Sequence, residues 1–316
     1  MKTIGEAATD EERTLEAALA NFGWRGRYLR AVPAVVSPVH RGVANACFRF
    51  DGEDGDSLFV KVPQADMAPL LDPAAAAEAA RIAGEAGVTP PLAAFDPETG
   101  VAAFGWLDDG WDYARNDALA RPEVLEAVLA HKRRLHDGPA FPRSDGPFER
   151  IDRLEGLLSP LAVHLPPDLP WLRDNLGLIR QALTAAGWDS RPCHLDQPAS
   201  NVMLGPGGAV LLVDFDSAGM ADPWYDIGAF LTEAFQFDED VRRGIAAYAG
   251  TCSDGLFARA RLWAIVDDLL WALWATWCFA TSPRRDIEFF KYASWRFMRA
   301  RMTLLDWRFE TWLRQL

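Results

Sequence analysis

The most constraining feature of this chain is a short polar loop that is followed directly by a glycine-rich hairpin. The loop reads H-L-D-Q-P-A-S-N and carries His194, Asp196 and Asn201. Two apolar runs follow it, joined by G-P-G-G at 205–208, and such a pair of runs around a glycine-rich turn predicts a β-hairpin. Because the second run ends at Asp214, the hairpin returns this carboxylate to the side of the loop.

The residue types in this segment point to phosphoryl transfer from ATP to a hydroxyl group. Asp and Asn oxygens are the hard ligands that Mg²⁺ prefers, and Mg²⁺ neutralises phosphate oxygens. A carboxylate within hydrogen-bond reach can take the proton of the acceptor hydroxyl. The spacing H-x-D-x-x-x-x-N has the order of a protein-kinase catalytic loop. It predicts Asp196 and His194 as catalytic residues and Asn201 and Asp214 as metal ligands.

Two other interpretations of the segment are weaker. Each polar residue taken alone could be an ordinary loop residue without a catalytic role, but all of them occur in the expected order around one hairpin. The run V-D-F-D-S also resembles the nucleophilic Asp-x-Asp motif of haloacid-dehalogenase phosphatases. That motif should open a Rossmann-like domain, whereas Asp214 lies about two-thirds along the chain, inside a hairpin.

The nucleotide phosphates require further groups upstream of the loop. Lys61, in the β-like run S-L-F-V-K-V-P, is placed to hold the α- and β-phosphates. Glu78, in the next helical segment, is the expected partner of Lys61, with Glu85 as second choice. No G-x-G-x-x-G phosphate loop is present. In H-R-G-V-A-N-A-C-F-R-F, Gly42 allows close backbone approach to phosphate, and Asn45 could turn the chain.

The pattern of elements changes near residue 104 and predicts two lobes. Residues 1–104 contain short β-like runs and one main helix at 73–86, and residues 105–316 are mainly helical apart from the hairpin. We therefore expect an α+β, bilobal, protein-kinase-like fold. Its small antiparallel-sheet lobe would bind nucleotide, and its larger helical lobe would carry the catalytic and substrate residues.

Composition narrows the classes of partner. A net charge of −13 repels phosphate backbones and anionic lipids, which disfavours nucleic acid and membrane surfaces and would suit a cationic substrate. The most apolar run, at 269–280, is too short to span a bilayer. The four scattered cysteines form no CxxC pair, and the N-terminus has no secretory pattern, so we expect a cytoplasmic protein. The oligomeric state stays open.

With these residues in place, the chain resembles the aminoglycoside phosphotransferase and choline kinase superfamily over about residues 30 to 300. The loop, the following metal motif and G-M-A-D-P-W-Y-D-I at 219–227 carry the resemblance. It implies that ATP and Mg²⁺ are the cofactors and that Asp196 is the base. It also implies that Asn201 and Asp214 hold Mg²⁺, whereas Asp226 braces the catalytic loop.

Several stretches are more similar to bacterial choline/ethanolamine kinase-like proteins than to the antibiotic-resistance branch. They are R-G-V-A-N-A-C-F-R-F, L-H-D-G-P-A-F-P and the helix containing D-L-L-W-A-L-W-A-T-W. In that branch a W-x-x-W pair supplies aromatic walls for a quaternary ammonium, which implies a cation cage of Trp271 and Trp274 with Tyr292 as a further ring. Plain core packing is the alternative for these rings. The second acidic residue after the metal ligand, Asp216, is expected on the substrate side.

The sequence departs from the family pattern at the middle of the loop. Leu195 stands where H-N-D is usual, Ser200 stands where Gly usually precedes the catalytic Asn, and Asp216 replaces a common Glu. The base and both metal ligands remain, so we expect an active kinase for choline, ethanolamine or a related amino alcohol. The alternatives are a phosphotransferase for an aminoglycoside, another natural product or a sugar, and a catalytically inactive nucleotide-binding module.

Overall fold

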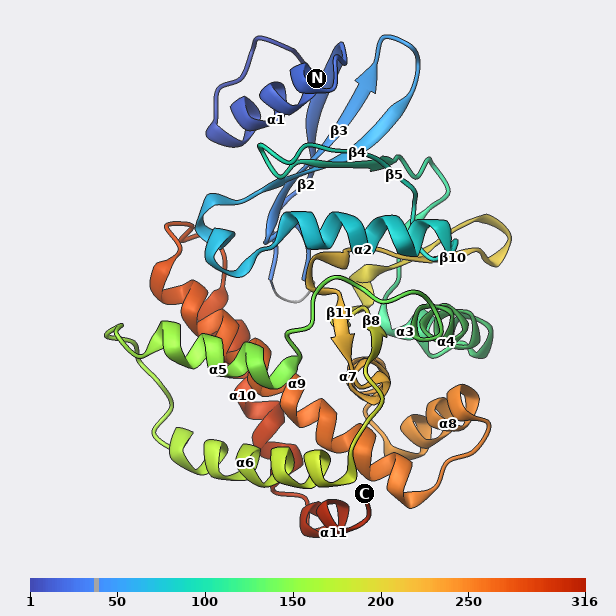
Figure 1. The fold of residues 1–316 in the computed structure, drawn as a ribbon, viewed down its shortest axis with the longest axis vertical. Helices are drawn as coiled ribbons and strands as arrows, with labels where there is room; N and C mark the ends of the chain where they lie inside the picture. The colour runs from blue at the N-terminus through green and yellow to red at the C-terminus, as the bar shows by residue number, and fades with distance from the viewer. Residues whose placement is uncertain (37–39) are drawn as a thin grey trace.

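The smaller lobe is built on one antiparallel sheet of six strands in the order β1-β2-β3-β4-β6-β5 (Figure 1). The computed structural model describes residues 1–36 and 40–316. Apolar residues of β3 and β4 alternate between the two faces, and one face packs against helix α1. The strands are β1 Lys2–Thr3, β2 Gly26–Val32, β3 Asn45–Gly52, β4 Ser57–Pro63, β5 Leu92–Phe95 and β6 Ala102–Gly105.

Two helices flank this sheet. Helix α1, Asp10–Asn21, begins with a capping box in which Thr9 and Glu12 satisfy each other's backbone N–H groups. Helix α2, Pro73–Glu85, begins with the Asp72 side chain as its cap and Pro73 in its first turn. Figure 1 shows α2 lying between the sheet and the larger lobe. Its small alanines pack into the larger lobe's core, so α2 joins the two lobes.

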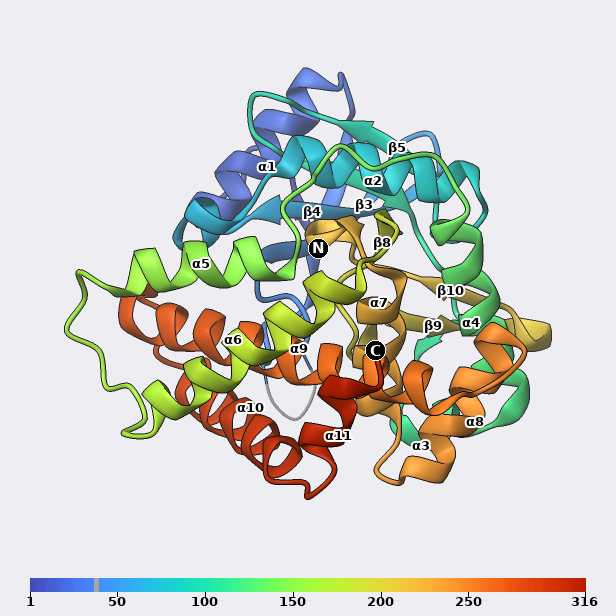
Figure 2. The ribbon, with the colours of Figure 1, turned by 60° about the horizontal axis from the view of Figure 1, so that its bottom comes forward.

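The larger lobe is helical and is organised around α9, Asp254–Thr281, which α5, α7 and α10 surround (Figure 2). By length and apolar composition α9 could span a membrane, but 89% of its most apolar window is buried inside the protein, as in a core helix. The remaining helices are α3 Asn116–Leu119, α4 Pro122–His136, α5 Pro147–Leu158, α6 Leu169–Ala186, α7 Pro223–Ala234, α8 Asp238–Ala249, α10 Phe289–Leu304 and α11 Phe309–Arg314.

The predicted hairpin is present as β9, Val202–Leu204, and β10, Val210–Leu212, with Val202 opposite Leu212. Its turn includes Gly207 at φ 67°, a left-handed conformation that glycine adopts without strain. Two features were not predicted. Strand β7, Asp112–Tyr113, adds to the hairpin, and β8, Arg191–Cys193, pairs with β11, Gly219–Ala221.

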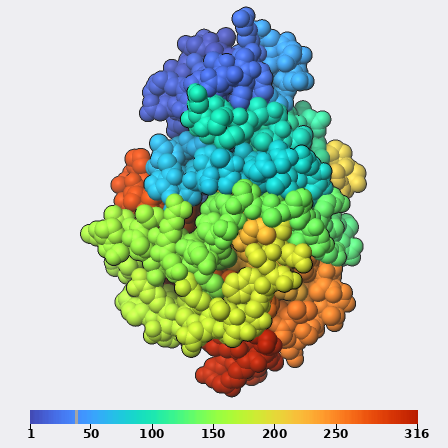
Figure 3. Space-filling model, viewed as in Figure 1, coloured from blue at the N-terminus to red at the C-terminus, as the bar shows by residue number. Residues whose placement is uncertain are grey.

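The two lobes are stacked, with the N-terminal third above the rest of the chain (Figure 3). This architecture confirms the predicted α+β bilobal fold. The smaller lobe contains a second long helix, α1, in addition to the one main helix predicted at 73–86. The boundary between residues 104 and 105 stays a prediction.

Candidate active site

The polar loop at residues 194–201, here called the catalytic loop, lies between β8 and the hairpin. Asp226, from the first turn of α7, accepts hydrogen bonds from the backbone N–H groups of His194 (3.2 Å) and Leu195 (2.9 Å). Leu195 adopts φ 62°, which is unusual for a residue with a Cβ. Asp226 therefore holds the loop in a conformation that its local sequence does not favour.

Further donors surround the fully buried Asp226. Its carboxylate accepts from Lys132 (3.3 Å), His136 (3.1 Å) and the Gln197 amide. Burial alone would raise the pKa of Asp226, but Lys132 and His136 hold it well below its ordinary value. His136, Cys193 and Asp226 lie close enough to suggest a metal cluster. We do not assign one, because protein donors already occupy the Asp226 oxygens.

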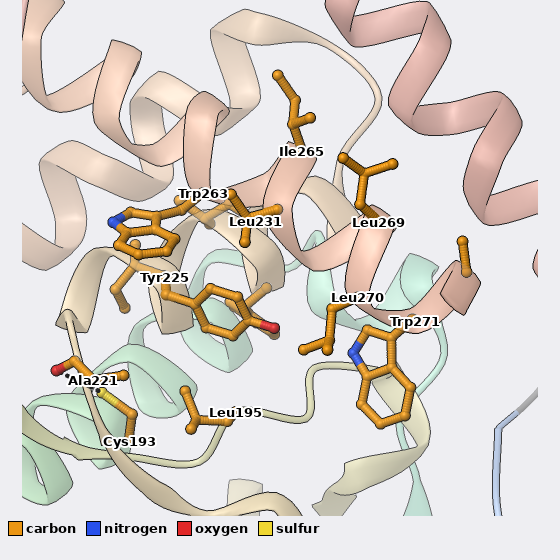
Figure 4. Packing of buried hydrophobic residues seen from close by; sticks show 14 of the residues in the cluster. Cys193, Leu195, Ala221, Tyr225, Leu231, Trp263, Ile265, Leu269, Leu270 and Trp271 are labelled. Carbon is orange, nitrogen blue, oxygen red and sulfur yellow. Dashed lines mark hydrogen bonds between the residues drawn. The ribbon is translucent and has the colours of Figure 1, made fainter. Parts of the chain in front are cut away.

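Figure 4 shows the packing behind the loop, where Tyr225, Leu270 and Trp271 lie near Leu195. The rings of Tyr225 and Trp263 meet edge to face at 5.6 Å between α7 and α9. The Cys193 thiol donates to the Ala221 carbonyl across the β8–β11 pair. The catalytic loop thus rests on a close-packed apolar core.

His194 lies beneath the catalytic loop and bonds to the main chain through both ring nitrogens. Its Nε2 lies 2.8 Å from the Val213 carbonyl oxygen, and its Nδ1 accepts from the Asp196 N–H at 3.3 Å. Burial and the nearby Lys132 lower the pKa of the imidazole. The sequence interpretation named His194 as catalytic, but this geometry makes it a positioning residue that ties the loop to the hairpin.

The predicted base and metal ligands meet in one cluster with Lys61. Asn201 donates to the Asp196 carboxylate at 3.0 Å, and the Lys61 ammonium contacts Asp214 at 2.7 Å and Asp216 at 2.6 Å. Burial and the nearby Asp214 raise the pKa of Asp196 well above its ordinary value. Three carboxylates with one ammonium leave an excess of negative charge in the cluster.

The two carboxylates that share Lys61 differ in their proton affinity. Burial would raise the pKa of Asp214, but Lys61 lowers it to about 2. Burial and Asp214 together raise the pKa of Asp216 to about 6. Although burial alone would lower it, both carboxylates raise the pKa of Lys61 above its ordinary value.

Of the remaining residues predicted to bind nucleotide, Asn45 and Gly42 lie at the cleft, whereas Glu78 does not. Asn45 donates from its amide to Asp216, and Gly42 has φ 61° at the wall of the cleft. The predicted pairing of Lys61 with Glu78 is wrong in this structure. Glu78 is 46% exposed and binds Arg81 on the outer face of α2, because Asp214 and Asp216 already occupy the lysine.

Two cavities meet at this cluster. A cavity of about 340 Å³ lies between the sheet, α2 and the hairpin, and includes Lys61 and Asn201 in its wall. A second cavity of about 100 Å³ lies on the other side and includes Asp196. Gly42, Asp214 and Asp216 belong to both walls. A ligand in the larger cavity could therefore present a group to a ligand in the smaller one.

The three predicted cage residues come together, with an unpredicted side chain among them. The His40 ring lies 5.5 Å from Trp271, 5.3 Å from Trp274 and 5.4 Å from Tyr292, measured between ring centroids. Burial and Arg296 lower the pKa of His40 to about 4, so the imidazole is neutral at pH 7. No spacing rule connects His40 to a helix more than 200 residues away, so sequence patterns offered no signal for it.

Arginine side chains also line the smaller cavity and were not predicted. Arg143 donates to the Asp216 backbone carbonyl at 3.0 Å and pairs with Asp145, which Arg150 also contacts. These residues follow the L-H-D-G-P-A-F-P stretch, whose resemblance to other kinases was the available signal.

Solved structures of other proteins share this two-lobed fold. A choline/ethanolamine kinase family protein from Mesorhizobium loti is 28% identical, covers 96% of this chain and 98% of its own, and superposes with a TM-score of 0.76. A choline kinase from Streptococcus pneumoniae has 16% identity, coverage of 95% and 100%, and a TM-score of 0.77. A GDP complex of an aminoglycoside 2'-phosphotransferase has 13% identity, coverage of 93% and 98%, and a TM-score of 0.60.

No curated protein matches the sequence. The profile of the phosphotransferase enzyme family matches residues 35–265, a span that contains Lys61, the catalytic loop and the hairpin. This match, together with the two-lobed fold, shows that the chain belongs to the phosphotransferase enzyme family.

Proposed function

We propose that this protein is a Mg²⁺- and ATP-dependent kinase that phosphorylates the hydroxyl of a small amino alcohol such as ethanolamine or choline. One observation carries the proposal. Asp196, Asn201, Asp214 and Lys61 converge where a large cavity meets a small one. ATP would lie in the larger cavity and the acceptor in the smaller one.

The proposed reaction is a direct transfer. The acceptor oxygen forms a bond to the γ-phosphorus while its proton passes to the Asp196 carboxylate, and the bond from that phosphorus to the bridging oxygen breaks to release ADP. A raised pKa suits a carboxylate that must accept a proton. Lys61 would position the α- and β-phosphates, with Gly42 and Asn45 alongside them.

The donor set fits a Mg²⁺ ion. The Asn201 amide nitrogen faces Asp196, which leaves its oxygen available, and Asp214 supplies a carboxylate that Lys61 keeps ionised. Burial raises the pKa of Asp216, and the neighbouring Asp214 raises it further, so a cation placed between these two carboxylates would offset their repulsion. Bound Mg²⁺ would supply charge stabilisation for the phosphate oxygens.

The size of the smaller cavity favours a small acceptor over an aminoglycoside. Its volume is about 100 Å³, and Trp271 and Trp274 occupy one side. Structural neighbours include AMP, ADP and GDP complexes, which supports a purine nucleotide as donor, and we propose ATP. The four cysteines are free, which fits the reducing cytoplasm that we propose as the location.

The test is ADP release with Mg²⁺ and ATP across ethanolamine, choline, aminoglycosides and simple sugars. We expect selective stimulation by an amino alcohol and its loss in Asp196→Asn. If only an aminoglycoside or only a sugar stimulated ADP release, the acceptor would belong to that class and not to the amino alcohols. Tight binding of Mg²⁺-ATP without turnover on a broad acceptor library would favour an inactive nucleotide-binding module.

A further inference from the structure

The aromatic site formed by Trp271, Trp274 and Tyr292 is the strongest feature that the proposed function leaves unexplained. A cation held by aromatic faces lies within about 6 Å of the ring centroids. The His40 imidazole lies within 5.5 Å of all three centroids, so it fills the space that such a cation would need.

The charges around this site would favour a cation, but the occupant is neutral. Arg296 and Arg299 share a buried network with three acidic side chains, which leaves one negative charge in excess; these acids are Glu233, Asp267 and Asp268. One ring is already engaged, because the Arg296 guanidinium lies 5.2 Å from the Tyr292 centroid and donates to its hydroxyl at 2.8 Å. The neutral imidazole therefore occupies a site whose surroundings suit a positive group.

His40 is held by ring packing and by its backbone. The Ser200 hydroxyl donates to the His40 carbonyl oxygen at 2.6 Å, which ties this residue to the catalytic loop. Among the described residues, the buried Nδ1 atom of the imidazole has no hydrogen-bond partner. Removing the ring therefore breaks no described polar contact of Nδ1 and leaves the backbone tie in place.

We propose that His40 sets acceptor specificity by filling the aromatic site, so that the protein accepts a small primary-amine head group and excludes a quaternary ammonium. Asp145, in the wall of the cavity that remains beside His40, is already paired with Arg143 and Arg150, but this wall also includes the carboxylates of Asp196, Asp214 and Asp216. A primary ammonium is small and can donate hydrogen bonds to them, whereas a quaternary ammonium has no N–H group and needs the ring faces. The claim about acceptor specificity rests on the proposed function, whereas the claim that His40 blocks binding of a quaternary ammonium does not.

The first experiment measures binding, which does not require turnover. Tetramethylammonium is titrated against wild type, His40→Ala and His40→Phe by calorimetry or tryptophan fluorescence, with sodium chloride matched for ionic strength. We expect His40→Ala to bind at least about tenfold more tightly than wild type. His40→Phe should resemble wild type, because its ring fills the same space. His164→Ala, an exposed histidine far along the chain, is the matched control.

The second experiment compares acceptors. In His40→Ala the kcat/KM for choline relative to ethanolamine should rise by at least about tenfold. Wild type that binds tetramethylammonium as tightly as His40→Ala would overturn the inference. So would a His40→Ala protein with a wild-type unfolding curve and no gain in binding. Turnover on none of the acceptors, with the binding contrast intact, would instead overturn the proposed function.

Discussion

Asp226 and Asp196 are two buried carboxylates, one bound to the backbone of the catalytic loop and the other within that loop, yet their surroundings are opposite. Asp226 accepts from two backbone N–H groups and three side chains, and its pKa is well below the ordinary value. Asp196 receives one amide donor, faces the charge of Asp214, and has a pKa well above the ordinary value. Burial is common to both, so their partners account for the difference.

The comparison separates a structural site at Asp226 from the proposed reactive site at Asp196. Groups of the protein itself supply the hydrogen bonds to the Asp226 carboxylate, so this site needs no ligand. The cluster of Asp196, Asp214 and Asp216 holds more negative charge than Lys61 neutralises, and it would be relieved by a cation. Substitutions in the two sites should therefore affect different properties.

The largest effect is expected at the base. Asp196→Asn should lower kcat by about 10² to 10⁴, because a positioned base contributes that much to the rate. Its melting temperature should be unchanged or higher, because a neutral amide removes repulsion with Asp214. ADP release and thermal unfolding measure the two quantities. A variant that unfolds more easily but keeps its turnover would reverse the proposed assignment of the two sites.

Asp226→Asn should mainly lower stability, unlike Asp196→Asn. We expect it to lower the free energy of unfolding by about 3 kcal/mol, because it leaves the buried Lys132 without its counter-charge. Since the pKa of Asp226 is lowered on folding, its stabilisation is complete above the unfolded pKa of about 3.9 and is lost as the pH falls below it. The gap between wild type and variant, measured by denaturant unfolding, should shrink at low pH. A constant gap would contradict the charge argument.

The stabilisation of the folded protein by Mg²⁺ should also distinguish the Asp214 site from the Asp226 site, with a smaller effect on the free energy of unfolding. At a concentration about 100 times its Kd, it should stabilise wild type by about 2.7 kcal/mol, since it binds the folded state. Asp214→Asn should lose most of this gain, and Asp226→Asn should keep it. Asp152→Asn, an exposed aspartate on α5, is the matched control. Thermal unfolding with and without Mg²⁺ gives the comparison, and an equal gain in Asp214→Asn would exclude this residue as a ligand.

The smallest effect is expected at Glu78. Its pair with Arg81 is exposed to solvent and contributes little to stability, so Glu78→Ala should leave both stability and the KM for ATP nearly unchanged. Nucleotide-dependent kinetics and denaturant unfolding check this. A large rise in the KM for ATP would mean that Glu78 reaches Lys61 when nucleotide is bound, which would restore the pairing predicted from sequence.

Local patterns in the sequence predicted the main helix of the smaller lobe, the hairpin and part of the site, but not β7 or the β8–β11 pair. The apolar runs on either side of G-P-G-G specified the hairpin, and the loop spacing brought Asn201 to Asp196 and Asp214 to their side. The helix predicted at 73–86 matches α2, Pro73–Glu85, to within a residue at its end. These features depend on neighbours within about a dozen residues, and turn and capping rules describe such neighbours directly.

The two-lobed fold and the hairpin after the polar loop could be predicted from the sequence, because both follow from short-range periodicity and spacing, whereas the metal-ligand roles of Asn201 and Asp214 stay predictions. The carboxylates that hold Lys61 and the side chain that fills the aromatic site became known only from the packing of the two lobes. Lys61 meets Asp214 across 153 positions, and His40 meets Trp271 from the opposite lobe. Such contacts depend on how the lobes pack, and in this packing Lys61 pairs with Asp214 and Asp216 while Glu78 pairs with Arg81 on its own helix.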